Sequence, residues 1–328
     1  MAVPLNLSLA IERYDRHFPF FDNTLQLPEG LNLTVYQTGQ SAPLRDGKGR
    51  HERMLHGGDY DVAEFSLSTF LMARARGMPI VGIPVFPRRL FSLSQMWVHP
   101  DSDLHQPRDL IGKKVAISSF QTTLSLLAKG DLKFQYDTPW EHIHWLLTTQ
   151  EKVPFDFKPG VRVDYIGGSR EDVAQKLANH EIDAFFLPHP PHSVVSGKLP
   201  ARRLISDCRA AEIDYFRRVG DFPIMHVIAL RQELAQQEPW LGRALYDLFN
   251  QAKSLAEEYY EDPGWSRLAW GRHYYEQEKA LFGSDPWENG FRRNRANLER
   301  FIQYSQDQGM IDSIYPPEEL FVDDTLNT

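Results

Sequence analysis

The sequence contains a single cysteine, Cys208, among 328 residues. One thiol cannot form a disulfide within the chain, and it argues against a metal centre built on cysteine thiolates. No apolar run is long enough to span a membrane. The N-terminus also lacks the basic start, apolar block and cleavage site of a secretory signal, so we expect a cytoplasmic protein with no membrane partner.

The sequence also has no excess of basic residues. The chain has 36 Lys and Arg against 44 Asp and Glu, which gives a formal net charge of −8. Nucleic-acid binding needs a concentrated basic face, so we expect no nucleic-acid partner. The pair Gly167-Gly168 lacks the spacing of a nucleotide-binding loop, and no Gly-x-Ser-x-Gly nucleophile motif occurs. We therefore expect no cofactor.

Short apolar segments alternate with segments of helical spacing through the first two thirds of the chain. Residues 5–11 and 31–35 alternate as half-buried strands do, and residues 169–179 have helical spacing. Beyond residue 232 the pattern becomes helical. Strands that alternate with helices predict an α/β fold with largely parallel sheets. The length is sufficient for two domains.

Residues 79–98 organise the rest of the chain. Two apolar runs are separated here by Pro84 and by Pro87-Arg88-Arg89. Proline has no amide hydrogen for a sheet, so these residues predict an irregular segment that crosses between two sheets. We interpret it as the floor of a cleft in which the arginines meet a substrate. A surface turn with solvated arginines is the alternative.

Motifs spread from the first strand to the tail form a set. They are Tyr14-Asp15-Arg16, residues 61–68, 84–91, 222–226 and 294–301, Pro239-Trp240, and residues 317–321. Together they resemble the 4,5-dihydroxyphthalate decarboxylase family. The resemblance implies an α/β, two-lobed, type 2 periplasmic-binding-protein-like fold with a ligand cleft between the lobes. Lobe 1 is expected to hold residues 1–91 and 226–328 with the C-terminal helices, and lobe 2 residues 92–225.

The chain departs from the family pattern at several positions. Ser92-Leu93 replaces an Arg-His pair, and Ser118-Ser119 replaces Pro-Glu. A histidine, His189, stands near a position where arginine is common, and His192 replaces a small residue. We expect these positions to face the cleft, where they would reduce the fixed positive charge available to a dicarboxylate. They therefore predict a substrate other than 4,5-dihydroxyphthalate.

Loss of CO2 from a hydroxylated aromatic acid without a cofactor needs a positioned proton donor and a dry pocket. The candidate donors are His226, His189, Glu64 and Asp15. Histidine titrates near neutral pH, and burial would keep Glu64 protonated. Arg89 would hold a carboxylate through two nitrogens. The other expected substrate-binding residues are Arg88, Ser66, Ser68, Ser94, Ser119, Gln121, Thr122 and His192.

Each candidate also has a purely structural interpretation. His226 can be a satisfied core histidine, and Glu64 can be the buried partner of Arg89 or Arg16. The hydroxyl residues can be simple helix caps. Two histidine pairs, His142-x-His144 and His189-x-x-His192, lack a clearly spaced carboxylate, so we expect no metal.

Two functional classes follow from these residues. The first is a cofactor-independent decarboxylase, a lyase that acts on a small carboxylic acid, which we expect to be a hydroxylated aromatic one, in aromatic acid catabolism. The second is a non-catalytic solute-binding protein for a small carboxylate, and another lyase on the same scaffold is a third. Fold alone does not decide between them. The sequence leaves open whether the chain forms a homo-oligomer.

Overall fold

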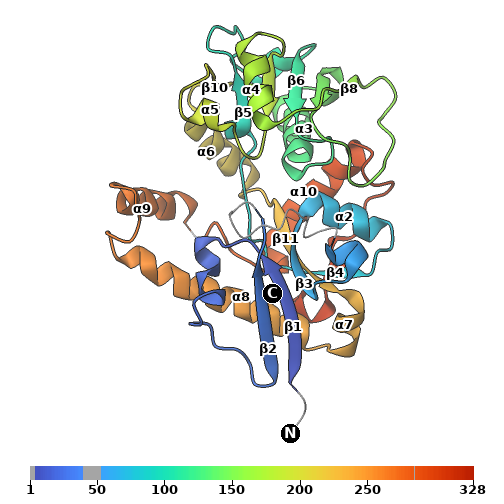
Figure 1. The fold of residues 1–328 in the computed structure, drawn as a ribbon, viewed down its shortest axis with the longest axis vertical. Coiled ribbons are helices and arrows are strands. Elements are labelled where there is room, and N and C mark those ends of the chain that lie inside the picture. The colour runs from blue at the N-terminus through green and yellow to red at the C-terminus, as the bar shows by residue number, and fades with distance from the viewer. Residues whose placement is uncertain (1–3, 40–52, 284) are drawn as a thin grey trace.

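The structure is a computed structural model that describes residues 4–39, 53–283 and 285–328. Two lobes, each with its own sheet, follow one another along the longest axis (Figure 1). The strands are β1 (Leu5–Ile11), β2 (Leu31–Gln37), β3 (Val62–Ser66), β4 (Ile80–Ile83), β5 (Met96–Val98), β6 (Lys114–Ile117), β7 (His144–Leu147), β8 (Val163–Tyr165), β9 (Ala184–Phe186), β10 (Arg202–Arg203) and β11 (His226–Arg231). The helices are α2 (Leu67–Ala75), α3 (Thr123–Tyr136), α4 (Arg170–Ala178), α5 (His192–Val195), α6 (Cys208–Val219), α7 (Gln232–Gln237), α8 (Leu241–Glu258), α9 (Gly271–Phe282) and α10 (Phe291–Asp307).

Both sheets are mixed. The lower sheet has the order β2-β1-β3-β11-β4, in which β1 is parallel to β2 and β3 while β11 is antiparallel to β3 and β4. The upper sheet has the order β10-β5-β9-β6-β7-β8, in which β5 is antiparallel to both neighbours. The two-lobed α/β fold is confirmed. The sheets are largely parallel, as expected, and each departs from a purely parallel arrangement through one strand, β11 or β5, that the chain enters from the other lobe.

The chain therefore passes twice between the lobes. The lower sheet takes its strands from residues 5–83 and 226–231, and the upper sheet from residues 96–203. β4 ends at Ile83, and no regular element occupies residues 84–92. The irregular crossing predicted from Pro84 and Pro87 is confirmed. The expected lobe boundaries at residues 91 and 226 remain a prediction.

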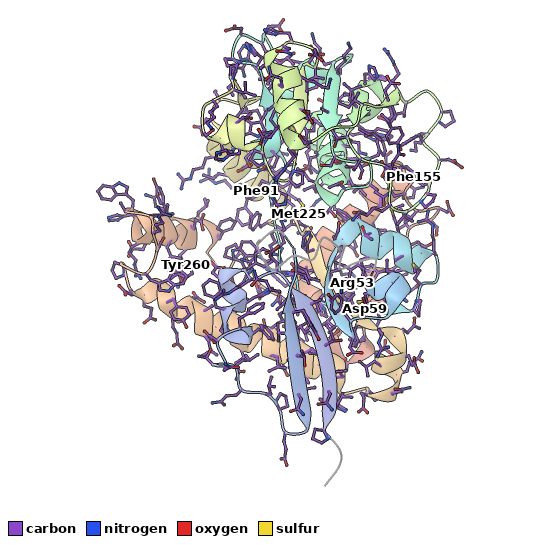
Figure 2. All side chains as sticks on the ribbon, viewed as in Figure 1. Arg53, Asp59, Phe91, Phe155, Met225 and Tyr260 are labelled. Atoms are coloured by element: carbon purple, nitrogen blue, oxygen red, sulfur yellow. The ribbon has the colours of Figure 1, made fainter. Side chains whose placement is uncertain are left out.

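The two crossing segments, residues 84–92 and 220–225, are hydrogen-bonded to each other. The Leu90 amide donates to the Pro223 carbonyl at 3.0 Å, and the Met225 amide donates to the Arg88 carbonyl at 2.8 Å. Figure 2 shows Phe91 and Met225 close together between the lobes. The junction of the lobes is thus a short two-stranded ribbon rather than two independent linkers.

Three clusters of buried apolar side chains form the core. The largest joins both lobes and includes side chains from β3, β6, α3 and α10. A second lies against α8, whose Leu241, Leu245 and Phe249 recur at helical spacing on one face. A third lies against α4 in the upper lobe. Among the described residues, no helix combines the length and the apolar character needed to cross a membrane.

The C-terminal helix α10 packs on α3 of the upper lobe around a buried carboxylate. A Cβ on Gly130 would lie 2.0 Å from the ring of Tyr304, so the close packing requires glycine. The neighbouring Asp131 accepts hydrogen bonds from Ser92 Oγ at 2.6 Å, Tyr215 OH at 3.0 Å and Tyr304 OH at 3.3 Å. Burial raises the pKa of Asp131 to about 6 despite these bonds.

We expect Asp131→Asn to leave the protein folded and to change how its stability depends on pH. An aspartate in the unfolded chain titrates near pH ~4, so the folded protein binds more protons than the unfolded chain between pH ~4 and ~6. Asp131 therefore lowers the free energy of unfolding as pH rises through this range, by at most about 3 kcal/mol. Urea unfolding at pH 4.5 and 7.5 measures this, and Asp131→Asn should be relatively more stable at pH 7.5. A larger loss of stability at pH 7.5 than at pH 4.5 would contradict it.

Candidate functional site

The antiparallel pairing of β3 and β11 brings together two residues that are distant in sequence. Ser66 pairs with His226, and Glu64 pairs with Ile228. Side chains two residues apart on a strand share a face, so Glu64 and Ser66 lie on the same face as His226. These three residues lie where β3 ends and β11 begins, next to the crossing segments.

Glu64 is completely buried, and several donors surround its carboxylate. The Glu12 amide donates to Oε2 at 2.9 Å, and Tyr14 OH donates to Oε1 at 3.0 Å. His226 Nδ1 also bonds to Oε1, and the His226 side chain is 14% exposed. Because Nδ1 faces a carboxylate, that nitrogen carries the proton, and acid–base chemistry would use Nε2. The structure therefore brings together Glu64 and His226, two of the predicted catalytic residues.

Arg88 and His189 complete one side of this site. The carbonyl of Arg88 accepts from the His226 amide at 3.2 Å. The Arg88 guanidinium lies 3.5 Å from His189 Nε2 and donates to the Pro188 carbonyl at 3.4 Å. Both contacts are long and therefore weak, and the Arg88 side chain is only half-buried. The first crossing segment thus places a cation between His226 and the end of β9.

A hydroxyl cluster joins the lobes on the other side. Ser66 Oγ lies 2.5 Å from Thr123 Oγ1, and Ser68 Oγ lies 2.9 Å from the same atom. Ser66 and Ser68 are at the start of α2, whereas Thr123 begins α3 of the upper lobe. Ser66 and Ser68 were expected at the site, and Thr123 was missed although it follows the predicted Thr122.

The expected anion site at the start of α3 already holds a carboxylate of the chain itself. Glu151 accepts hydrogen bonds from the amides of Phe120 at 2.5 Å and Gln121 at 3.1 Å. The Gln121 side chain bonds through both its oxygen and its nitrogen to the backbone of Val153. Gln121 therefore holds the 151–153 loop, which corrects its expected role in substrate binding.

Ser119 and Thr122 also stand at the start of α3. Their hydroxyls are 2.9 Å apart and hydrogen-bonded to each other. Ser119 is buried, whereas Thr122 is partly exposed. They form a local turn before the helix, and their expected substrate contact remains a prediction.

The expectation that Arg89 binds a substrate carboxylate is corrected by its surroundings. Arg89 is 5% exposed, and its guanidinium donates to the carbonyls of Phe222 at 2.8 Å and Glu288 at 2.9 Å and to Asn294 Oδ1 at 2.6 Å. Burial lowers the pKa of Arg89 to about 10. Arg89 thus fastens the crossing segments to the C-terminal region, and Arg88 is the arginine that reaches the site.

Two further expected binding residues lie away from Glu64 and His226. The Ser94 amide donates to Glu212 of α6 at 2.8 Å, and its hydroxyl accepts from the side chain of Gln95. His192 is exposed on α5, and its amide donates to Glu171 of α4 at 2.7 Å. Both contacts belong to the upper lobe, so these two expectations are corrected as well.

The departure from the family pattern at Ser92-Leu93 does not face the cleft. Ser92 is buried against Asp131, and Leu93 is buried in the large core. Ser92 and Leu93 therefore pack beneath the crossing segment, and their expected effect on the substrate remains a prediction.

The Asp15 carboxylate is hydrogen-bonded to two neighbouring side chains and not to His226. Its carboxylate accepts from the Arg16 guanidinium at 3.1 Å and from Tyr260 OH. Arg16 in turn lies over the rings of Tyr14 and Trp287. Sequence analysis did not select Tyr14, Arg16 or Trp287 as site residues, although the motif Tyr14-Asp15-Arg16 already stood out. A proton-donor role for Asp15 is not supported by these contacts.

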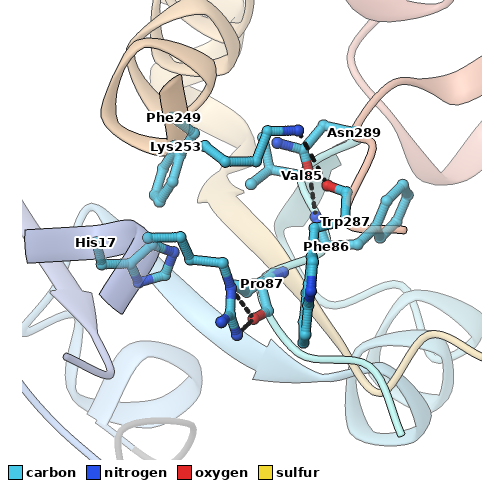
Figure 3. A pocket seen from close by; sticks show the side chains of 9 residues that line it. His17, Val85, Phe86, Pro87, Phe249, Lys253, Trp287 and Asn289 are labelled. Carbon is cyan, nitrogen blue, oxygen red and sulfur yellow. Dashed lines mark hydrogen bonds between the residues drawn. The ribbon is translucent and has the colours of Figure 1, made fainter. Parts of the chain in front are cut away.

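Arg16 and Trp287 are also among the residues that line a small pocket, which Figure 3 shows from close by. His17, Phe86, Phe249, Lys253 and Asn289 are among its other lining residues. The pocket has room for about one water molecule, because only about 10 Å³ of it is open to the centre of a water-sized sphere. Glu64 and His226 do not line it. This pocket is therefore too small for an aromatic acid and is separate from the acid–base residues.

The histidines considered as metal ligands have other partners. His144 Nε2 bonds to Asp164 on the neighbouring strand at 2.6 Å. His192 is exposed, and His189 contacts Arg88. Within residues 4–39, 53–283 and 285–328, no three histidine, cysteine, aspartate or glutamate side chains are grouped as metal ligands.

Comparisons with known proteins bear on the same residues. A family model described as NMT1/THI5 like matches residues 29–133. The chain is 29% identical over 326 residues to 4,5-dihydroxyphthalate decarboxylase from Comamonas testosteroni, covering 97% of this chain and 96% of that protein. It is 26% identical over 223 residues to the protein of that name from Pseudomonas putida, covering 66% of this chain and 83% of that protein.

A solved structure shares the fold. A periplasmic sulfonate-binding protein from Methylobacillus flagellatus aligns with a TM-score of 0.59 at 13% identity, over 98% of this chain and 92% of that one. This similarity confirms the two-lobed binding-protein architecture. The sequence matches extend over nearly the whole chain, so the chain is similar throughout to 4,5-dihydroxyphthalate decarboxylases.

Proposed function

We propose that this protein is a cofactor-independent decarboxylase of a small, hydroxylated aromatic carboxylic acid. The observation that carries the proposal is the hydrogen bond between the buried Glu64 carboxylate and His226 Nδ1 at the junction of the two lobes. The names of the two relatives support a carbon–carbon lyase. A buried carboxylate that orients a histidine is the arrangement that a proton-transfer enzyme requires.

The proposed reaction transfers one proton and breaks one bond. Protonated His226 gives the Nε2 proton to the ring carbon that bears the carboxylate, while a ring hydroxyl supplies electron density to the resulting cation. The bond to the carboxylate then breaks, its electron pair returns to the ring, and CO2 leaves. Glu64 stabilises the imidazolium before transfer, and solvent restores the proton afterwards.

Arg88 is the proposed partner of the substrate carboxylate. Its guanidinium has weak contacts with His189 and Pro188, and its backbone is bonded to His226. A carboxylate bound there would lie next to the proposed proton donor. The hydroxyls of Ser66, Ser68 and Thr123 offer hydrogen bonds on the opposite side. A cytoplasmic location stays a prediction.

A solute-binding protein without catalysis is the second candidate. The sulfonate-binding protein with the same fold favours it. Binding a carboxylate requires fixed donors but no proton transfer, whereas the Glu64–His226 pair supplies a titratable group at the site. The deciding experiment incubates the purified protein with hydroxylated benzoic and phthalic acids and measures CO2 release. Release from one acid supports the decarboxylase, whereas tight binding of an acid without release supports the binding protein.

His226→Gln should lower kcat by roughly 10²- to 10⁴-fold, because glutamine cannot transfer the proton. Glu64→Gln should lower kcat by at least ~10²-fold, because an amide neither fixes the Nδ1–H tautomer nor stabilises the imidazolium. His144→Gln is the matched control, since His144 is also buried against a carboxylate but lies on β7. Its kcat should remain within about twofold of the wild type. Equal losses in all three variants, with equal loss of melting temperature, would contradict the catalytic role.

The two arginines of the crossing segment should separate binding from stability. Arg88→Gln should raise the dissociation constant of the acid by an amount equivalent to about 2 kcal/mol or more, with little change in melting temperature. Arg89→Gln should lower the melting temperature, because it removes the guanidinium hydrogen bonds to the Phe222 and Glu288 carbonyls and to Asn294 Oδ1. Calorimetry with the acid and thermal unfolding measure both. If Arg89→Gln binds the acid more weakly while Arg88→Gln binds it as the wild type does, the binding role belongs to Arg89 instead.

A further inference from the structure

Arg16 occupies an unusual position beside the Glu64–His226 pair. Its guanidinium carbon lies 4.2 Å from the ring centroid of Tyr14 and 3.8 Å from that of Trp287. The side chain is 16% exposed. A guanidinium held flat between two aromatic rings has little freedom to move, so its charge and its donors are fixed in direction.

The donors of Arg16 are directed at the crossing segment and at Asp15. Nε donates to the Pro87 carbonyl at 2.9 Å, and Nη2 donates to the same carbonyl. Nη1 donates to Asp15 Oδ1 at 3.1 Å, and Asp15 also accepts from Tyr260 OH. Tyr260 follows α8, on the side of the molecule from which α9 projects (Figure 2). Arg16 therefore joins its own segment to Pro87 and Trp287, which are distant in sequence, and Tyr260 is attached to it through Asp15.

Two of these contacts reach the proposed active site. Tyr14, on which Arg16 stacks, donates its hydroxyl to Glu64 Oε1, the oxygen that also bonds His226. Pro87, whose carbonyl Arg16 holds, directly precedes Arg88. Moving Arg16 would thus disturb both the carboxylate that orients the histidine and the backbone that carries the proposed binding arginine.

We infer that Arg16 is a positioning residue, which holds Tyr14 on Glu64 and Pro87 beside Arg88 and supplies a fixed positive charge to the Glu64–His226 pair. The catalytic part of this inference rests on the proposed function. Its electrostatic part concerns only the titration of His226. Arg16 does not contact the reacting atoms in this assignment.

Electrostatics agree with the geometry. Burial lowers the pKa of Arg16, while the nearby charges of Asp15, Tyr14 and Glu64 raise it. Interaction between charges is reciprocal, so the cation favours ionised Glu64, and we expect it to oppose protonation of the adjoining His226. Among the residues that the structure describes, the titratable or charged groups near the pair include Tyr14, His17, Glu12, Asp15, Arg88 and His189.

The test measures the pH titration of the His226 resonance by NMR in protein labelled at histidine carbons. The spectrum of His226→Gln identifies that resonance. Arg16→Gln removes the charge and should move the His226 titration to higher pH by roughly half a unit. Arg16→Lys keeps the charge and should leave the titration within about 0.2 unit. Arg13→Gln is the matched control, because Arg13 is exposed three residues earlier and lies over Phe18 instead.

Turnover provides the second readout. Arg16→Lys should lower kcat by ~10-fold or more and also raise KM, because the lysine cannot reproduce the fork that holds Asp15 and Pro87, the neighbour of Arg88. The basic limb of the kcat/KM profile, where His226 loses its proton, should shift to higher pH in Arg16→Gln and stay in place in Arg16→Lys.

A second variant keeps the inference testable where Arg16→Gln fails to fold. Asp15→Asn retains Arg16 but removes a negative charge, so the His226 titration should shift to lower pH. If the His226 titration is unchanged in whichever of Arg16→Gln and Asp15→Asn folds, the inference is overturned. A shift in Arg13→Gln or Arg16→Lys equal to the shift in Arg16→Gln would also overturn it. Because NMR needs no substrate, this failure is distinguishable from absence of decarboxylation, which would overturn the proposed function instead.

Discussion

The hydrogen bond between Glu64 and His226 is the interaction on which the site depends. A carboxylate with no exposed surface is expensive to bury, and here the Glu12 amide, the Tyr14 hydroxyl and the imidazole compensate for its lost hydration. The imidazole is one of these donors only when β11 pairs with β3 in the observed register. A shift of one residue would turn His226 to the other face of the sheet. The same pairing that completes the lower sheet therefore creates the acid–base pair.

The crossing segments connect this pair to the rest of the molecule. Arg89 secures them from the C-terminal side through two carbonyls and Asn294, and Arg16 secures them from the N-terminal side through Pro87. Between these two buried arginines, Arg88 remains the one whose guanidinium has only long contacts. An extended backbone directs neighbouring side chains to opposite sides, which agrees with the different surroundings of these consecutive arginines.

How far the sequence predicts this structure differs from feature to feature. Alternation of apolar residues and the two prolines predict strands, lobes and an irregular crossing, because these depend on local periodicity. Glu64 and His226 were found as separate candidates, but their contact joins positions 162 residues apart, and no local pattern encodes that register. Arg88 and Arg89 were ranked wrongly, because an irregular segment has no period from which the direction of a side chain follows. Ser92 was misplaced for the same reason, and the cation–aromatic stack of Arg16 depends on Trp287, 271 positions later.

The tautomer of His226 tests this account most directly. Nitrogen-15 NMR of histidine-labelled protein distinguishes a protonated Nδ1 from a protonated Nε2 in the neutral ring. The account predicts that neutral His226 carries its proton on Nδ1, and that Glu64→Gln removes this preference. A neutral His226 protonated on Nε2 in the unaltered protein would contradict it, since Glu64 would then not orient the proposed proton donor.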